Sequence, residues 1–143
     1  LDFGPATTFC VVNEKGEYLG GAIAPGIGIS MNALVEKTAQ LPKVEMNIPE
    51  HVIGRNTSNA IQSGLLYGYC GLVDGMVHRI ADELGMPLQQ IKVIATGGLA
   101  ELIHANSETI QEVNQMLTLQ GLHILYEKNK KLHSRAEKGG APC

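Results

Sequence analysis

The chain of 143 residues contains no tryptophan, and only 4% of its residues are aromatic. So little aromatic surface leaves few side chains on which nucleic-acid bases could stack or which could anchor an interface. The 11 lysine and arginine residues are outnumbered by 14 aspartate and glutamate residues, which gives a formal net charge of -3. This balance argues against a nucleic-acid partner and against a polybasic membrane patch.

Cysteines and long apolar runs are also scarce. Cys10, Cys70 and Cys143 follow neither a CxxC pattern nor the spacing of a zinc site. Thiols without such spacing are typical of a reducing compartment, so disulfides and structural zinc are not expected. No segment approaches the roughly 18 apolar residues of a membrane span, and no basic segment precedes an apolar one at the N-terminus. We therefore expect a cytoplasmic protein without a membrane partner.

The hydrophobic content of 44% is sufficient for one ordinary core in a chain of this length. We expect a single α/β domain over residues 1–129. The residues that follow are mostly charged or small, which is typical of a segment without a packed core. Residues 130–143 are accordingly predicted to form a flexible tail.

Two hydrophobic segments near the N-terminus flank a short polar one. Residues 7–13 and 18–24 are rich in apolar and β-branched side chains, and residues 14–17 between them are polar. This alternation predicts a β-hairpin. Ser30 is a candidate N-cap for a short helix over residues 31–39, and two prolines within residues 40–50 predict an extended connection.

The longest predicted helix covers residues 58–84. Its apolar side chains recur every three or four residues, as a buried helical face requires, and Gly85 is well placed to end it. A strand over 91–96, a helix over 99–104, an edge strand within 110–113 and a helix over 117–129 follow. Four apolar residues of the last helix are expected to face inward: Leu119, Leu122, Leu125 and Tyr126.

The long helix also carries a stripe of four glycines, which are Gly64, Gly68, Gly71 and Gly75. Each costs about 0.8 to 1 kcal/mol relative to alanine in a helix interior, so the four together cost about 3 to 4 kcal/mol. Close approach of another backbone could offset this cost. The sequence leaves open whether that backbone belongs to the domain's own sheet or to the matching helix of a partner chain.

The first residues of the chain form an Asp-x-Gly turn, Asp2 to Gly4, followed by Thr7 and Thr8. Glycine lets the backbone approach a ligand, hydroxyls and amides donate hydrogen bonds, and a carboxylate is a hard oxygen ligand for a cation. The turn is therefore predicted to hold a cation and phosphate oxygens. Such a turn normally follows a strand, so we expect a sheet whose first strand is truncated.

A second glycine turn, Gly97 and Gly98, connects the predicted strand at 91–96 to the helix at 99–104. In α/β proteins a ligand often lies beyond the carboxyl end of such a strand, against bare backbone and helix amides. A tight connection without a ligand would have the same sequence. The turn alone leaves both interpretations open.

Five separated motifs follow one another along the chain. They are DFGPATT at 2–8, GGAIAPG at 20–26, GRNT at 54–57, ATGGLA at 95–100 and LTLQGL at 117–122. This series closely resembles the C-terminal half of type III pantothenate kinases, within the actin-like and sugar-kinase superfamily. The resemblance spans residues 1–129.

The resemblance implies a ribonuclease-H-like, actin-like ATPase domain with a mixed sheet. It also implies ATP-dependent phosphorylation of pantothenate in coenzyme A biosynthesis, by a homodimer that uses Mg²⁺ on the nucleotide and a monovalent cation, K⁺ or NH₄⁺. By position, Asp2 would hold the monovalent cation and Thr57 would contact pantothenate. Seven residues would face ATP: Gly4, Pro5, Ala6, Thr7, Thr8, Gly97 and Gly98.

Two departures from the family pattern matter. Pro5 stands where the family usually has threonine, and proline lacks both the hydroxyl and the backbone N–H. We therefore expect weak ATP binding. The family's general base lies in a Gly-x-Asp-Arg motif that this sequence does not contain, so no catalytic residue is assigned and the isolated chain is expected to be inactive. The alternative is a non-catalytic nucleotide-binding or dimerisation module on the same fold.

Overall fold

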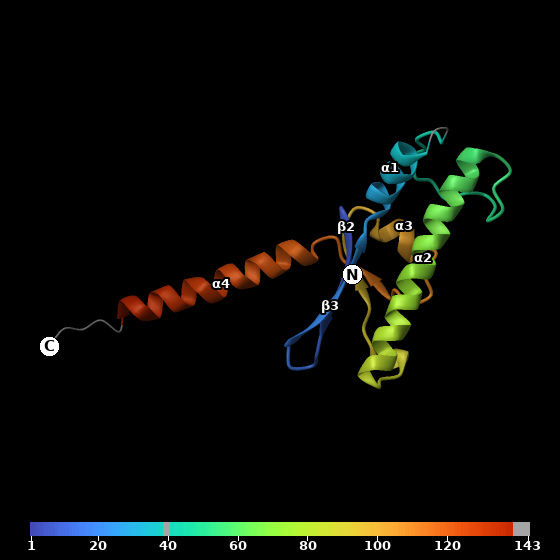
Figure 1. The fold of residues 1–143 in the computed structure, drawn as a ribbon. Coiled ribbons are helices and arrows are strands. Elements are labelled where there is room, and N and C mark those ends of the chain that lie inside the picture. The colour runs from blue at the N-terminus through green and yellow to red at the C-terminus, as the bar shows by residue number, and fades with distance from the viewer. Residues whose placement is uncertain (39–40, 139–143) are drawn as a thin grey trace.

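The structure, a computed structural model, describes residues 1–38 and 41–138, with side chains described as far as residue 130. Figure 1 shows a body of strands and helices from which one long helix projects. The strands lie in the middle of the body, and the longest of the body's helices covers one side of them. The arrangement is a mixed α/β fold.

The predicted β-hairpin is confirmed. Strand β2 (Ala6–Val12) pairs antiparallel with β3 (Tyr18–Pro25). The side chain of Asn13 stabilises the turn because its Oδ1 accepts hydrogen bonds from the backbone N–H groups of Lys15, at 3.0 Å, and Glu17, at 2.9 Å. Strand β1 (Asp2–Phe3) pairs antiparallel with the other edge of β2.

A second, parallel pair of strands joins this sheet. Strand β4 (Ile94–Ala95) lies within the predicted strand at 91–96, and β5 (Glu112–Val113) is the expected edge strand. A parallel bridge connects Asp2 with Thr96. The Phe3 N–H donates to the Thr96 carbonyl at 2.9 Å, and the Thr96 N–H donates to the Leu1 carbonyl at 2.9 Å. The strands therefore follow one another in the spatial order β3, β2, β1, β4, β5.

The long helix is confirmed almost to the residue. Helix α2 (Thr57–Leu84) starts at an Asn56 cap, whose side chain accepts a hydrogen bond from the Asn59 N–H at 2.8 Å. It ends at Gly85, whose φ of 63° is a left-handed conformation that glycine adopts readily. Its buried face includes Leu66 and Val73, both 0% exposed, and packs in one core with Phe3, Phe9, Val93 and Ala95.

The first helix begins earlier than the sequence predicts. Helix α1 (Ile27–Lys37) starts after Gly26, so Ser30 lies inside it and the prediction of Ser30 as N-cap is wrong. Instead, the Ser30 and Tyr69 hydroxyls lie 2.5 Å apart, and the Tyr69 hydroxyl donates to the Pro25 carbonyl at 2.6 Å. The Ser30 hydroxyl therefore makes a tertiary contact with α2 and does not cap a helix.

The connections agree with the expected pattern. Residues 41–49 form neither helix nor strand, as predicted, and Gln40 lies outside the described residues. A short 3-10 helix, η1 (Leu88–Gln90), leads towards β4, and α3 (Ala100–His104) connects β4 to β5. Among the helices that the structure describes, none is both long and apolar enough to cross a membrane.

The last helix differs most from its prediction. Helix α4 (Leu117–Lys138) projects from the body, and it continues beyond residue 129, where the sequence predicts its end. Its apolar row was expected to face inward, but Leu119, Leu122, Leu125 and Tyr126 are between 56% and 61% exposed. That expectation is wrong, because the periodic pattern marks an apolar face without showing that the chain covers it. The division into a domain over 1–129 and a tail over 130–143 stays a prediction.

The glycine stripe of α2 is open in the structure. A Cβ atom built at Gly64, Gly68, Gly71 or Gly75 would meet nothing within 4 Å beyond its own helix neighbourhood. The interpretation that the domain's own sheet approaches these glycines is therefore wrong for the described residues. The alternative, a helix of a partner chain, stays a prediction.

Candidate nucleotide site

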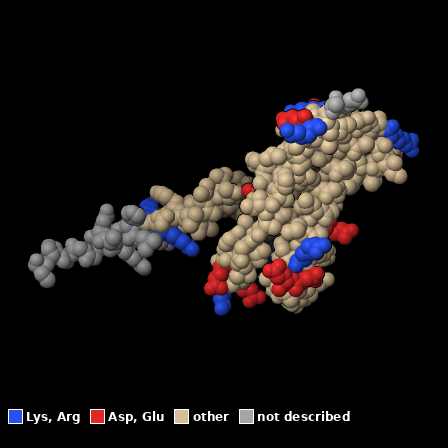
Figure 2. Space-filling view, viewed as in Figure 1, with Lys and Arg blue, Asp and Glu red and all other residues tan. Residues whose placement is uncertain are grey.

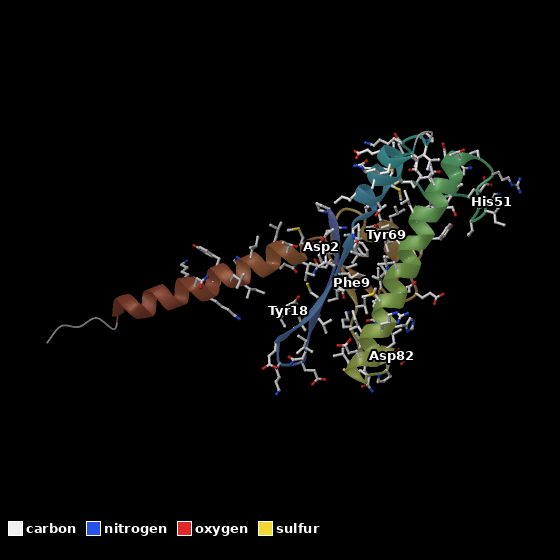
Figure 3. The ribbon with its side chains drawn as sticks, viewed as in Figure 1. Asp2, Phe9, Tyr18, His51, Tyr69 and Asp82 are labelled. Atoms are coloured by element: carbon white, nitrogen blue, oxygen red, sulfur yellow. The ribbon has the colours of Figure 1, made fainter. Side chains whose placement is uncertain are left out.

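The candidate site forms where β1, β2 and the end of β4 meet. Asp2 pairs with Thr8 of β2 on one side and with Thr96 after β4 on the other. Residues paired across neighbouring strands point to the same face of a sheet, so these three side chains share a face. The Asp2 carboxylate is exposed there, while Thr8 is half-buried. Figure 3 shows Asp2 at the strands in the middle of the molecule.

Gly97 brings the second glycine turn into contact with the first. Its φ of 97° is unfavourable for any residue with a side chain. A Cβ atom at this position would lie 2.7 Å from Asp2 Oδ1 and 2.7 Å from the Phe3 carbonyl oxygen. Only glycine fits here, so the turn at Gly97 and Gly98 lies directly against Asp2.

The Gly4–Pro5 turn rests against the start of α1. The Gly4 N–H donates to the Ala6 carbonyl at 3.2 Å, and the Gly26 N–H donates to the Pro5 carbonyl at 3.0 Å. A Cβ atom on Gly26 would lie 2.3 Å from that carbonyl oxygen. The first turn of α1, with its unpaired N–H groups, therefore begins beside the predicted phosphate loop. The sequence analysis assigned no site role to Gly26, although a Pro-Gly pair before a helix could have indicated this contact.

Thr7 does not present its hydroxyl as expected. Its side chain is 1% exposed, and its Oγ1 has no hydrogen-bond partner among the described residues. Because side chains alternate along a strand, Thr7 points to the core face while Thr8 points to the face of Asp2. The Thr7 hydroxyl therefore does not point to the face of Asp2 in this structure, and Thr8 is the threonine that shares that face. The role of Thr7 in nucleotide binding stays a prediction.

Thr57 lies apart from these residues. It is the first residue of α2 and is exposed, and it lines a separate groove of about 310 Å³ with Leu34, Ala60 and Gly64. In Figure 3, His51 marks the loop before α2 at the far upper end of the molecule, well away from Asp2. Thr57 and Gly64 are seven residues apart, so they lie on one face of α2. Within one copy, the structure does not bring Thr57 to the glycine turns.

Sequence reasoning missed a polar cluster around Asp74 of α2. Asp74 Oδ1 accepts hydrogen bonds from the Ser107 hydroxyl at 2.6 Å, the Thr109 hydroxyl at 2.8 Å and the Thr109 N–H at 3.1 Å. Burial raises the pKa of Asp74, but these bonds and one from the Glu108 N–H outweigh it, so the net pKa is lowered. Ser107 and Thr109 lie more than 30 residues away, so no local signal could have revealed the contact.

Cys70, also on α2, shows the opposite effect. Its thiol is buried, and desolvation together with the nearby Asp74 charge raises its pKa to about 11. A thiol in this state is an inert core group rather than a nucleophile.

Comparison with known proteins decides the family. A sequence model of the type III pantothenate kinase family matches residues 1–79, more than half of the chain. The chain belongs to the type III pantothenate kinase family. It is 59% identical over 130 residues to a type III pantothenate kinase of Anaeromyxobacter sp. (strain Fw109-5), an alignment that covers 91% of this chain and 50% of that protein. It is 52% identical over 139 residues to the type III pantothenate kinase of Koribacter versatilis (strain Ellin345), covering 97% and 50% respectively.

The chain thus spans about half the length of the curated kinases it matches, and it corresponds to their C-terminal half. Among solved structures, its fold is similar to that of a conserved Campylobacter jejuni protein assigned to the Baf family of transcriptional activators. The TM-score is 0.62 at 19% identity, over 91% of this chain and 57% of that one. At this identity the likeness shows the fold alone.

Proposed function

We propose that this chain supplies one wall of the nucleotide site of an ATP-dependent pantothenate kinase, an enzyme of coenzyme A biosynthesis. One observation carries the proposal: Asp2 lies between Thr8 and the Gly97 turn, with its carboxylate exposed. Two bare backbone turns and a hard oxygen ligand are thereby gathered around β1, the central strand of the sheet. Family membership supports the reaction, and the other wall would come from the half of the kinase that this chain does not span.

The roles follow from the chemistry of the groups. The backbone of residues 4–8, beside the first turn of α1, would face the phosphates of ATP, and Gly97 and Gly98 would face its adenosine. Asp2 would hold a monovalent cation, K⁺ or NH₄⁺, since an exposed carboxylate is an oxygen ligand suited to a hard cation. Mg²⁺ would arrive on the nucleotide, where it neutralises phosphate charge. A ribonuclease-H-like fold is consistent with the mixed strand order.

Pantothenate binding and dimerisation are proposed together. Thr57 would contact pantothenate, and the open glycine stripe of α2 lies on the same helix face. A second copy packed along this stripe would cover four exposed or half-exposed glycines and would approach Thr57. A homodimer would therefore have two effects. Its packing would offset the helix-propensity cost of the four glycines, and the second copy would add residues around Thr57.

The test of the nucleotide site is ATP binding by calorimetry, measured with the whole chain in the presence and absence of K⁺. Asp2→Ala should weaken binding at least about tenfold, and should remove any dependence of affinity on K⁺. Asp82→Ala, which removes an exposed carboxylate from the far end of α2, is the matched control. If Asp2→Ala binds ATP as the parent chain does, the proposed site is wrong.

Pro5 offers a second test, because it removes a donor from the phosphate loop. If that donor meets a charged phosphate oxygen, its loss is on the order of 1.5 to 3 kcal/mol. Pro5→Thr should therefore tighten ATP binding about 10- to 100-fold. An unchanged dissociation constant in the same titration would show that the Gly4–Pro5 turn does not contact phosphate.

The alternative of a non-catalytic dimerisation module is favoured by the same open stripe. Sedimentation of the chain and of Gly68→Leu separates the two functions. A dimer packed through the stripe should dissociate in Gly68→Leu, whereas ATP binding should not change. A dimer that persists in Gly68→Leu would show that the stripe is not the dimer interface, either in the kinase or in a non-catalytic module.

A further inference from the structure

Two hydroxyl groups and one carbonyl group meet where α1 begins. The Tyr69 hydroxyl of α2 donates to the Pro25 carbonyl at 2.6 Å, and it lies 2.5 Å from the Ser30 hydroxyl. A phenol has one proton to donate, so in the second contact the Tyr69 oxygen accepts and Ser30 donates. Tyr69 therefore holds both the last residue before the helix cap and a residue of the first helical turn.

The Pro25 carbonyl is not part of the ladder between β2 and β3. The Gly26 N–H donates to the Pro5 carbonyl at 3.0 Å, and this bond flanks the pair of Ala6 and Pro25. In an antiparallel ladder, bonds of this kind lie on either side of a non-hydrogen-bonded pair, so Pro25 directs its carbonyl away from β2. Proline also has no N–H to donate. Within the described residues, Tyr69 rather than the ladder holds this end of β3.

The next residue, Gly26, rests on the predicted phosphate loop. A Cβ atom on Gly26 would lie 2.3 Å from the Pro5 carbonyl oxygen and 2.6 Å from the Gly4 carbonyl oxygen. The Gly26 carbonyl accepts a hydrogen bond from the Ser30 N–H at 3.0 Å, which is the first such bond of α1. Closely packed backbone transmits small displacements. A shift of Gly26 would therefore move the Gly4–Pro5 turn, the first N–H groups of α1, or both.

The surroundings of Tyr69 favour its two hydrogen bonds. Tyr69 is 8% exposed, and Ser30 is half-buried. Figure 3 shows Tyr69 where the start of α1 approaches α2. Figure 2 shows the charged side chains of this face gathered near the ends of the molecule, with few between them. Hydrogen bonds between neutral groups are stronger where little water and little charge compete for them, and bonds in series strengthen one another.

We propose that Tyr69 is a positioning residue of the nucleotide site. Together with Ser30, it fixes the start of α1 against the Gly4–Pro5 turn and thereby sets the affinity for the phosphates of ATP. The inference rests on the proposed function for the identity of the ligand. Because the Tyr69 hydroxyl is engaged with Pro25 and Ser30, it acts through the backbone and does not contact ATP. Its effect should fall on the phosphates and spare the adenosine, which faces a different turn in the proposed site.

The first test follows the loop without any nucleotide. Tyr69→Phe removes the hydroxyl and keeps the ring in the core. Amide hydrogen exchange at Gly26 should become at least about fivefold faster, because its bond to the Pro5 carbonyl loses support. Ser63→Ala is the matched control, since Ser63 is another buried residue of α2 whose hydroxyl donates to a backbone carbonyl, that of Val52. Unchanged exchange at Gly26 in Tyr69→Phe, or an equal increase in Ser63→Ala, would overturn the proposal.

The second test compares two ligands by calorimetry, ATP and adenosine. All chains carry Pro5→Thr, which restores a donor to the loop and keeps the backbone carbonyl that Gly26 uses. Tyr69→Phe should weaken ATP binding about three- to tenfold, the equivalent of one hydrogen bond, and should leave adenosine binding unchanged. Ser30→Ala, which leaves the bond from Tyr69 to the backbone in place, should weaken ATP binding about twofold. A loss of structure would weaken both ligands alike, and that result would overturn the proposal.

The positioning role and the proposed function fail in different ways. ATP binding that Asp2→Ala weakens but Tyr69→Phe does not would keep the nucleotide site and reject the positioning role. No ATP binding by the Pro5→Thr chain would reject the nucleotide site and, with it, the role of Tyr69 towards ATP. Faster exchange at Gly26 together with a selective loss of ATP affinity in Tyr69→Phe would support both.

Discussion

Helices α2 and α4 carry the same kind of apolar periodicity but end in opposite environments. In α2, Leu66 and Val73 are completely buried against the sheet, whereas Leu122 and Leu125 of α4 are both 57% exposed. Figure 1 shows α2 lying along the strands and α4 leaving them. The pattern of a helix therefore determines which face is apolar, and only a packing partner determines whether that face is buried.

The largest difference between the two helices should appear when a leucine is truncated. Leu66→Ala should lower the free energy of unfolding by about 2 to 5 kcal/mol, because it removes a fully buried side chain and leaves a cavity. Leu122→Ala on α4 should lower it by less than about 0.5 kcal/mol. Urea denaturation of both variants measures the contrast. Equal losses would show that the apolar row of α4 is covered in solution.

The Asp74 contacts should make α2 sensitive to acid. Because the pKa of Asp74 is lowered on folding, its stabilisation is present above the usual value of 3.8 and is lost as the pH falls through the lower pKa of the folded state. At neutral pH, Asp74→Asn should cost about 1 to 3 kcal/mol, since hydrogen bonds to a charged group are weakened. The urea midpoint, followed downward from about pH 6, measures both effects. Asp82→Asn on the same helix is the control, and a loss as large as that of Asp74→Asn would contradict the assignment.

The sheet face under α2 offers a stabilising change. Thr7→Val replaces a buried hydroxyl that has no partner among the described residues with a methyl group of similar size. Stability should rise by about 1 kcal/mol, because an unpaired buried polar group is unfavourable. Thermal unfolding measures the gain, with Thr8→Val on the other face as the comparison. A loss of stability in Thr7→Val would mean that its hydroxyl has a partner in solution.

The smallest effect compares one glycine from each helix. Neither Gly68 of α2 nor Gly121 of α4 has an atom within 4 Å of a built Cβ beyond its own helix neighbourhood. In the monomer, at low protein concentration, each substitution by alanine should therefore stabilise its helix by about 0.8 to 1 kcal/mol. At a concentration at which the proposed homodimer forms, Gly68→Ala should instead lose stability. Chemical denaturation of the two variants, at a low and a high protein concentration, tests this. If Gly68→Ala loses stability where Gly121→Ala gains it, a second backbone packs on the stripe.

Local chemistry made much of the fold predictable. The hairpin follows from two apolar runs around a polar turn, and the end of α2 follows from Gly85. The resemblance to the kinase family implied that both glycine turns face one ATP. The reason that the turns meet is visible at Gly97, where a side chain would collide with Asp2. The prediction of Ser30 as a helix N-cap failed because its hydroxyl forms a hydrogen bond with Tyr69, which lies 39 residues away in the sequence.

The sequence by itself determined the order of strands and helices, the turns that require glycine and the apolar face of each helix, since these depend on neighbouring residues and on backbone sterics. The tertiary structure decided which threonine of the pair at 7–8 is buried, which acid of α2 is held by hydrogen bonds, and which helix face remains open. Those outcomes depend on contacts between segments far apart in the sequence. The pattern of a helix or strand does not specify which other segment packs against it.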